Sequence, residues 1–220
     1  MTKEINWKKW YDENTRKYKE EYKIMDYGSS KSMYARYQAA SNILQIEKNM
    51  LVLDAGCGLG TFGNYLLNRK KTEIHIIGLD ISENMIRLAR QKTHYHEFVV
   101  GSITSICFKN CMFDCVTCLE VLQNFNGSVE AAISELIRIL KRGGKFFLTT
   151  LDKNYIGFKS GERRRNPINR YYSPEDLVSL CESFGISIKR LGAISTDSTE
   201  FELLPLHASH VFFIYGEKVV

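Results

Sequence analysis

The 220-residue sequence lacks the features that mark fibrous, repeat and membrane proteins. It contains only three prolines, no internal repeat and no low-complexity tract. No apolar run approaches the length of a membrane span, and the charged amino-terminal region lacks the apolar core of a secretory signal. Because 44% of the residues are hydrophobic, we expect one compact domain over residues 1–220, located in the cytoplasm.

A glycine-rich turn is present, but it lacks the lysine of a phosphate-binding P-loop. The glycines have the spacing Gly56-x-Gly58-x-Gly60 and follow an apolar segment, 51–53, that predicts a buried strand, with a predicted helix after them. Glycines in such a turn let a ligand approach the backbone closely. A second apolar run ends at Asp80, where a doubly wound fold places an acidic residue against ribose hydroxyls. The two motifs predict a ligand that contains a nucleoside.

The same turn also satisfies the dinucleotide fingerprint as Gly58-x-Gly60-x-x-Gly63, so a nicotinamide or flavin enzyme is an alternative. Asp54 separates the two interpretations, because it lies at the predicted carboxyl end of the first strand. Two like charges about 4 Å apart cost roughly 4 kcal/mol at an effective dielectric constant near 20, which disfavours a diphosphate there. S-adenosylmethionine carries an ammonium and a sulfonium and has no phosphate, so the electrostatics favour this cofactor.

The rest of the sequence alternates between predicted strands and helices, which indicates an α/β fold. We expect a Rossmann-like, seven-stranded, mostly parallel sheet with helices on both faces. The last two predicted strands have no helix between them, so they are expected to pair antiparallel. The predicted strands are 51–54, 74–79, 97–100, 113–118, 144–150, 186–194 and 210–217. The predicted helices are 33–45, 61–69, 83–91, 128–140 and 174–184.

Six cysteines are present, and four of them, Cys107, Cys111, Cys115 and Cys118, are crowded enough to suggest a zinc site. Zinc ligands usually come as two close pairs separated by a longer span, which is not the spacing here. Cys115 and Cys118 also lie in a predicted strand, three positions apart, so their side chains should point to opposite faces. We therefore expect buried free thiols and no bound metal.

Four motifs occur in an order that resembles the class I S-adenosylmethionine-dependent methyltransferases, over about residues 43–215. The motifs are LDAGCGLG at 53–60, IIGLDISENMIRLAR at 76–90, FDCVTCLEVLQNF at 113–125 and LKRGGKFFLTT at 140–150. Within this family, the sequence is similar to the small single-domain enzymes that act mostly on metabolites and natural products. The resemblance implies methyl transfer from S-adenosylmethionine.

The resemblance also implies roles for individual residues. Asp54 and the glycine turn would hold the methionine moiety of the cofactor, directly or through water, and Asp80 would bind the ribose hydroxyls. Ile81 and Met85 would flank the adenine ring, and a buried helix face is the alternative role of both, more so of Met85 than of Ile81. The full predicted cofactor set is Asp54, Ala55, Gly56, Cys57, Gly58, Gly60, Asp80, Ile81, Met85, Ser102, Ile103 and Leu119.

Two positions depart from the family pattern. Ser102 lies where many relatives have an aspartate that accepts a bond from adenine, and Asn124 lies where they often have a histidine. The amino-terminal region, 1–42, is predicted to form lid helices over a core at 43–220, because its Trp-Tyr-Asp at 10–12 resembles a Tyr-Asp pair that closes over the cofactor in relatives. Alternatively, the aromatic residues of this region only dock a helix on the core.

Two further segments, 152–172 and 193–209, are predicted to cover the carboxyl edge of the sheet, where ligands bind in open α/β folds. Residues 153–172 include six basic residues and one acidic residue. The net charge of this segment, +5, equals the formal net charge of the whole chain. Arginines at 163–165 would bind the carboxylate or phosphate of an anionic small-molecule acceptor, and a solvated loop is the alternative. The balanced charge elsewhere argues against a nucleic-acid partner.

No pattern marks a catalytic dyad, and an activated methyl group does not require one. We expect in-line attack by an oxygen or nitrogen of the acceptor, with positioning and desolvation supplying up to about 7–11 kcal/mol. A general base is needed only for an acceptor that arrives protonated, and the candidates are His207, His210, Tyr11 and Tyr155. The main alternative is a macromolecular acceptor such as tRNA or a protein. The sequence gives no indication of the oligomeric state.

Overall fold

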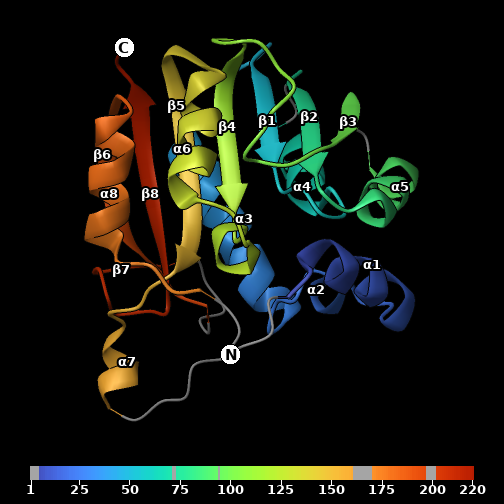
Figure 1. Cartoon of the computed structure of the whole chain (residues 1–220), viewed down its shortest axis with the longest axis horizontal. Coiled ribbons are helices and arrows are strands. Elements are labelled where there is room, and N and C mark those ends of the chain that lie inside the picture. The colour runs from blue at the N-terminus through green and yellow to red at the C-terminus, as the bar shows by residue number, and fades with distance from the viewer. Residues whose placement is uncertain (1–4, 71–72, 94, 161–169, 197–201) are drawn as a thin grey trace.

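One sheet forms the centre of the molecule (Figure 1). The computed structural model describes residues 5–70, 73–93, 95–160, 170–196 and 202–220, and eight strands lie within this part of the chain. Their order is β3-β2-β1-β4-β5-β8-β6-β7, with β1 to β5 paired in parallel and β8 joined antiparallel to β5 and β6. The strands are β1 Leu51–Ala55, β2 His75–Asp80, β3 Glu97–Val100, β4 Phe113–Leu119, β5 Leu140–Leu151, β6 Ile186–Ile194, β7 Leu203–Leu204 and β8 Val211–Lys218.

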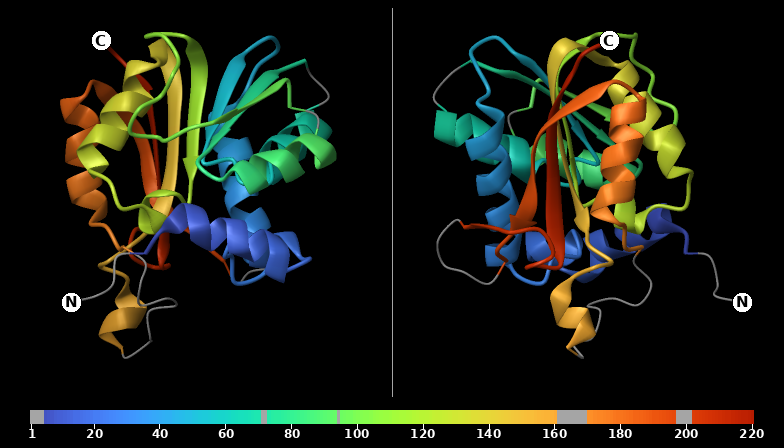
Figure 2. Two further views of the ribbon diagram at one scale, coloured as in Figure 1. Left: turned by 45° about the vertical axis from the view of Figure 1, so that its right-hand side comes forward. Right: turned by 90° about the vertical axis from the view of Figure 1, so that its left-hand side faces the viewer.

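Helices cover both faces of the sheet and bury two apolar cores (Figures 1 and 2). Helices α3 Ser30–Leu44, α4 Thr61–Lys70 and α5 Glu83–Lys92 pack on one face, and α6 Val129–Arg138 and α8 Pro174–Ser183 pack on the other. Each strand contributes side chains to both cores, because successive side chains of a strand point to opposite faces of the sheet. Phe146 and Phe147, adjacent in β5, accordingly belong to different cores.

Serine side chains begin four of these helices. Ser29, Ser82, Ser128 and Ser173 precede α3, α5, α6 and α8, and each hydroxyl accepts a bond from a backbone N–H in the first turn. Before α8, the serine is followed by proline at the first helical position, as the sequence predicts. Within the described ranges, no helix combines the length and the apolar character that crossing a membrane requires.

The structure confirms the predicted α/β class, the parallel sheet and the antiparallel pairing of the last two long strands. It adds an eighth strand, Leu203–Leu204, which pairs with the end of β6 and is too short to give a periodic signal. Strand β5 begins at Leu140, four residues earlier than predicted, because Leu140 already pairs with Phe113 before a register shift. The preceding helix, predicted to reach 140, therefore ends at Arg138.

The cysteines occupy two kinds of environment. Cys115 and Cys118 lie in opposite cores, as the strand spacing predicts, and Cys57 and Cys181 are also buried. Cys107 and Cys111 are exposed, so the prediction of buried thiols is wrong for this pair. Both lie in the connection between β3 and β4, which runs over the surface.

The amino-terminal helices lie beyond the carboxyl ends of the central strands (Figures 1 and 2). They are α1 Trp7–Lys17 and α2 Glu21–Ile24. A 3-10 turn, η1 Leu122–Asn124, follows β4 at the same edge, and the short helix α7 Ile156–Lys159 projects below the sheet in Figure 1. This edge of the sheet therefore carries most of the irregular structure, as expected for the ligand-binding side of an open α/β fold.

Candidate active site

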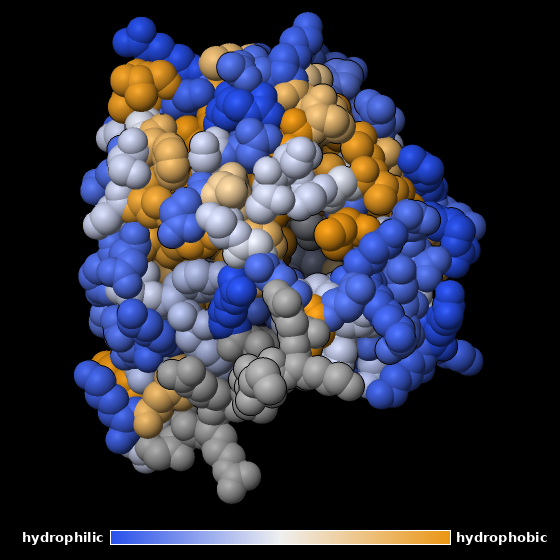
Figure 3. Space-filling model, in the orientation of Figure 1, coloured by the Kyte–Doolittle hydropathy of each residue, from blue (hydrophilic) through white to orange (hydrophobic). Residues whose placement is uncertain are grey.

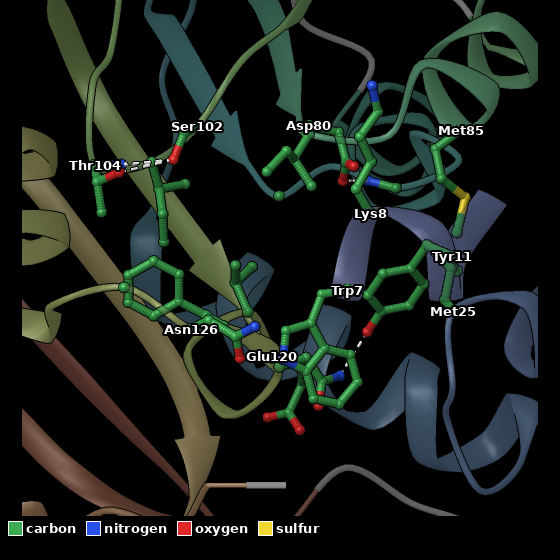
Figure 4. Close-up of a pocket in the computed structure, with 18 of the residues that line it drawn as sticks. Trp7, Lys8, Tyr11, Met25, Asp80, Met85, Ser102, Thr104, Glu120 and Asn126 are labelled. Carbon is green, nitrogen blue, oxygen red and sulfur yellow. Dashed lines mark hydrogen bonds between the residues drawn. The ribbon is translucent and has the colours of Figure 1, made fainter. Parts of the chain in front are cut away.

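A cavity of about 480 Å³ lies between the carboxyl ends of the central strands and helix α1 (Figure 4). Figure 3 shows a recess near the middle of the face that this view presents. The strand order reverses between β1 and β4, which is where open α/β sheets bind their ligands. The lining consists of residues 5–8, 11, 25, 27, 56, 58, 80, 81, 85, 101–104, 119–121 and 124–127.

The glycine turn brings bare backbone to the cavity wall. Gly56 and Gly58 have φ angles of 74° and 53°, which glycine adopts at little cost. A Cβ atom on Gly56 would lie 2.2 Å from Cγ2 of Val121, and one on Gly58 would lie 3.0 Å from Sδ of Met25. Both positions therefore need glycine for their conformation, and Gly56 also needs it for space.

Asp80 ends β2 beside this turn (Figure 4). Its Oδ2 accepts a bond from the Gly58 N–H at 2.9 Å, and its Oδ1 accepts one from the Ser82 N–H at 2.9 Å. Burial raises the pKa of Asp80, and these backbone bonds oppose the rise. The carboxylate is thus fixed in the lining, with lone pairs remaining for the hydroxyl groups of a ligand.

Five further predicted residues also lie in the lining. They are Ile81, Met85, Ser102, Ile103 and Leu119. Ile81 is 44% exposed, which is unusual for a large apolar side chain, whereas Met85 is 1% exposed and belongs to a small buried cluster as well. Ser102 Oγ lies 2.8 Å from Thr104 Oγ1 and accepts a bond from the Thr104 N–H. The lining therefore offers apolar walls around a pair of hydroxyls.

Among the described residues, four members of the predicted cofactor set lie next to the turn but outside the lining: Asp54, Ala55, Cys57 and Gly60. The Asp54 carboxylate is 3% exposed and accepts bonds from Tyr95 Oη at 2.6 Å and from Thr117 Oγ1 at 3.2 Å. Burial raises the pKa of Asp54 to about 6, although both hydroxyls act in the opposite direction. The structure places this carboxylate behind the glycine turn, and its contact with a cofactor stays a prediction.

Sequence reasoning missed a buried ion pair at the cavity. Glu120 lines the cavity just after β4, with a φ of 59°, and its Oε1 lies 3.3 Å from Nε of Arg36. Gln123 Nε2 donates to the same carboxylate at 3.0 Å. Glu120 stands inside the third motif, but Arg36 gave no signal, because an arginine on a predicted helix is usually solvated. The lining thus contains the carboxylates of Asp80 and Glu120 and the ammonium of Lys8, and Glu120 is paired with Arg36.

Helix α1 is bonded to the β4 side of the cavity (Figure 4). Trp7 Nε1 donates to Asn126 Oδ1 at 3.0 Å, and Asn124 Nδ2 donates to Tyr11 Oη at 2.5 Å. Trp7, Tyr11 and Asn124 all line the cavity, so the helix forms part of the wall rather than only docking on the core. Burial raises the pKa of Tyr11, which therefore stays a neutral phenol at physiological pH.

The same helix is bonded to α5 on the opposite side. Ser82 Oγ donates to Asp12 Oδ1 at 2.5 Å, and Lys8 Nζ lies 2.9 Å from Glu83 Oε1. Because α1 touches the segments that follow both β2 and β4, it spans the cavity from one wall to the other. That the amino-terminal helices act as a lid stays a prediction.

The other three base candidates, His207, His210 and Tyr155, lie outside the lining in the described part of the chain. His207 Nδ1 lies 2.7 Å from Asp152 Oδ2, and its Nε2 lies 3.1 Å from Glu175 Oε1. The ring of Tyr155 packs against His210 with centroids 6.0 Å apart. These contacts tie the ends of the two predicted covering segments to each other, away from the cavity.

Two described residues at the end of segment 152–172 are bonded to the η1 turn. The Arg170 N–H donates to Gln123 O at 2.9 Å, and Tyr172 Oη donates to Leu122 O at 2.9 Å. Both bonds hold the η1 turn that presents Asn124 to α1. The arginines at 163–165, predicted to bind an anionic acceptor, lie outside the described residues.

The strand order, the antiparallel β8 and a cavity beside a glycine turn define a class I methyltransferase fold. Residues 53–148 match the family model of a methyltransferase domain, so this part of the chain is similar to that family. The match begins in β1 and ends in β5, so it contains every strand end that reaches the cavity. Residues of α1, which complete the lining, fall outside it.

Individual curated proteins are similar to parts of the chain. An uncharacterized protein of Methanocaldococcus jannaschii is 34% identical over 110 residues, 50% of this chain and 44% of that protein. A demethylmenaquinone methyltransferase of Listeria welshimeri is 28% identical over 137 residues, 60% of this chain and 57% of that protein. The chain therefore spans about half the length of the curated relatives it matches.

A solved structure shows the fold over nearly the whole chain. It is a complex of the Haloferax volcanii Trm112 methyltransferase activator with a methyltransferase, and it superimposes with a TM-score of 0.73 over 99% of both chains. At 17% identity, this likeness shows the shared fold alone.

Proposed function

We propose that the protein transfers the methyl group of S-adenosylmethionine to an oxygen or nitrogen of a small molecule bound beneath α1. One observation carries the proposal: a single cavity joins the glycine turn, Asp80 and the aromatic face of α1. A relative named as a demethylmenaquinone methyltransferase supports an acceptor of small size.

The residues around the glycine turn fit the cofactor. Backbone at Gly56 and Gly58 is open to the cavity, Asp80 presents a fixed carboxylate for ribose hydroxyls, and Ile81 and Met85 offer apolar surface for adenine. The Asp80 carboxylate in the lining attracts the positive charges of the cofactor. When bound, S-adenosylmethionine supplies a methyl group that its sulfonium has already activated.

The chain's own contribution to the reaction is then to orient the acceptor and to exclude water. Trp7 and Tyr11 cover the cavity, and Asn124 fixes the Tyr11 hydroxyl. Closing the site in this way strengthens the electrostatic interactions inside it and holds the acceptor near the methyl group. With its raised pKa, Tyr11 acts as a hydrogen-bonding phenol and not as a general base.

The cofactor part of the proposal is tested by calorimetry with S-adenosylhomocysteine and with NADH. We expect saturable binding of S-adenosylhomocysteine and none of NADH. Binding of NADH alone would restore the nicotinamide alternative and remove the proposed reaction.

An anionic acceptor is a second part of the proposal, and it rests on the basic residues at 163–165. Once an acceptor is known, changing Arg163, Arg164 and Arg165 together to serine is expected to raise its Michaelis constant at least tenfold, because paired guanidinium bonds to an anion are lost. The turnover number should change much less. An unchanged Michaelis constant would show that the loop is only solvated.

A macromolecular acceptor is the second candidate function. The observation that suggests it is that the Haloferax methyltransferase of the same fold was solved in complex with a protein activator. The test is transfer of a labelled methyl group to total tRNA, to protein and to a small-molecule extract, each with and without a Trm112-type activator. Label that appears only in tRNA or protein would replace the small-molecule proposal.

A further inference from the structure

One hydroxyl group, that of Tyr95, joins the two ends of the glycine turn. Tyr95 Oη donates to Asp54 Oδ2 at 2.6 Å and accepts a bond from the Gly63 N–H at 2.7 Å. Asp54 lies in β1 just before the turn, and Gly63 lies in the first turn of α4 just after it. The hydroxyl therefore closes a loop that contains Gly56, Gly58 and Gly60.

The surroundings of this hydroxyl are shaped to hold the tyrosine in place. Its ring stacks on Phe98, with centroids 4.8 Å apart and an interplanar angle of 12°. A Cβ atom on Gly63 would lie 2.2 Å from the Tyr95 ring, so this glycine provides the space for it. The third glycine of the apparent dinucleotide fingerprint thus accommodates a tyrosine from the segment between α5 and β3.

Thr117 provides the second support of the Asp54 carboxylate. Its Oγ1 donates to Asp54 Oδ1 at 3.2 Å from the neighbouring strand β4. Asp54, Tyr95 and Thr117 are all buried, so each bond acts where water does not compete. Bonds to an ionised carboxylate are roughly twice as strong as bonds between neutral groups.

We propose that Tyr95 is a positioning residue for the cofactor. Its hydroxyl bridges the Asp54 carboxylate and the Gly63 N–H, and this bridge fixes the shape of the glycine turn between them. The proposal rests on the proposed function, since the turn is taken to bind S-adenosylmethionine. It gives Asp54 a role behind the turn that does not require contact with the ligand.

The state of the carboxylate then controls the turn. Burial raises the pKa of Asp54 to about 6, so protonation just below neutral pH converts strong bonds into weaker ones. The other titratable groups that face Asp54 are one carboxylate, three thiols and three phenols. They are Asp80 on β2, Cys57 in the turn, Cys115 and Cys118 on β4, Tyr27 before α3, Tyr37 on α3, and Tyr95. The pKa values of the cysteines and tyrosines are raised, so only Asp54 and Asp80 change charge in the acidic range.

The test is the affinity for S-adenosylhomocysteine between pH 5 and 8, measured by calorimetry for the wild type and for Tyr95→Phe. The variant keeps the ring stack and loses only the hydroxyl. We expect its affinity at pH 7.5 to fall about tenfold. We also expect the pH midpoint of binding, near 6 in the wild type, to move upward, because a bond that lowers the pKa of Asp54 is gone. Asp80 is common to both proteins, so the difference reports on Asp54.

Two further variants make the outcome decisive. Tyr65→Phe, which removes a hydroxyl from the exposed side of α4, should match the wild type in affinity and midpoint. Thr117→Val should also raise the midpoint, while changing the affinity at pH 7.5 less than threefold, and it replaces Tyr95→Phe if that variant does not fold. An unchanged midpoint would overturn the proposal, even with weaker binding. No binding by the wild type would instead remove the proposed function.

Discussion

The two halves of the cavity wall are built in different ways. The half formed by the glycine turn and Asp80 is held by bonds from backbone N–H groups and by buried side chains of two strands. The half formed by α1 is held by side-chain bonds at its two flanks, through Asn124 and Asn126 on one side and Ser82 and Glu83 on the other. The first half belongs to the folding core, and the second half is attached to it.

This difference assigns cofactor binding to the fixed half of the wall and the entry of ligands to the half formed by α1. A site that must bind one cofactor gains from a wall that does not move, since preorganised groups lose no entropy on binding. A site that must admit two ligands needs a part that opens at low cost, and regions with few buried apolar contacts open most easily. Changes in the turn should therefore affect global stability and cofactor affinity, whereas changes under α1 should affect only local opening.

The largest effect is expected from Gly56→Ala. The new Cβ atom would lie 2.2 Å from Val121 in a backbone with a φ of 74°, so strain and overpacking together should lower the free energy of unfolding by about 2–5 kcal/mol. Gly143→Ala is the matched control, because its φ is also 74° but nothing lies within 4 Å of the added atom. Denaturant unfolding should show a loss of about 1 kcal/mol there. Equal losses in the two variants would mean that close packing at the turn contributes nothing.

Asp54→Asn should instead stabilise the fold while it weakens the cofactor site. The pKa of Asp54 is about 6 in the folded protein and 3.8 in the unfolded chain. Between these pH values the folded protein binds one proton more than the unfolded chain, so the stability of the wild type falls as the pH rises from about 4 to 6. Above pH 6 the wild type must keep this buried carboxylate ionised, and the neutral amide of the variant removes that need, so the variant's free energy of unfolding should be higher by up to about 3 kcal/mol. Unfolding curves at pH 4 and pH 8 should show a gain only at the higher pH. A loss of stability at pH 8 would contradict the direction of this pKa shift.

Asp80→Asn tests the fixed wall at the carboxylate that the Gly58 and Ser82 N–H groups hold. The amide keeps the size of the carboxylate but loses its charge and replaces one acceptor with a donor, so one of the two backbone bonds is lost as well, and the affinity for S-adenosylhomocysteine should fall by about 1–3 kcal/mol. Asp114→Asn is the control, since Asp114 pairs with Lys141 at the amino-terminal edge of the sheet. Calorimetry should show wild-type affinity for this control. The prediction would be wrong if both variants bound equally well.

The sequence predicts those parts of the cavity whose contacts join residues close together along the chain. The glycine turn and Asp80 follow from local patterns, because a strand period, a glycine spacing and an acidic strand end are each visible within a few residues. Tyr95 and Arg36 gave no such signal, since their partners Asp54 and Glu120 lie 41 and 84 positions away along the chain. The position of Asp54 behind the turn was hidden for the same reason: only the tertiary structure shows which hydroxyls face its carboxylate.

The smallest effect is expected under α1. Asn124→Ala removes the bond to Tyr11 and leaves the core intact, so the free energy of global unfolding should change by less than about 1 kcal/mol. Amide exchange in α1 should become several times faster, because the helix is then held mainly at its other contacts. Asn42→Ala is the control, since its Oδ1 accepts a bond from Arg69 and neither residue lines the cavity, and exchange in α1 should not change. If Asn124→Ala lowered global stability as much as Gly56→Ala, α1 would be part of the folding core, and the distinction between a fixed wall and an attached wall would fail.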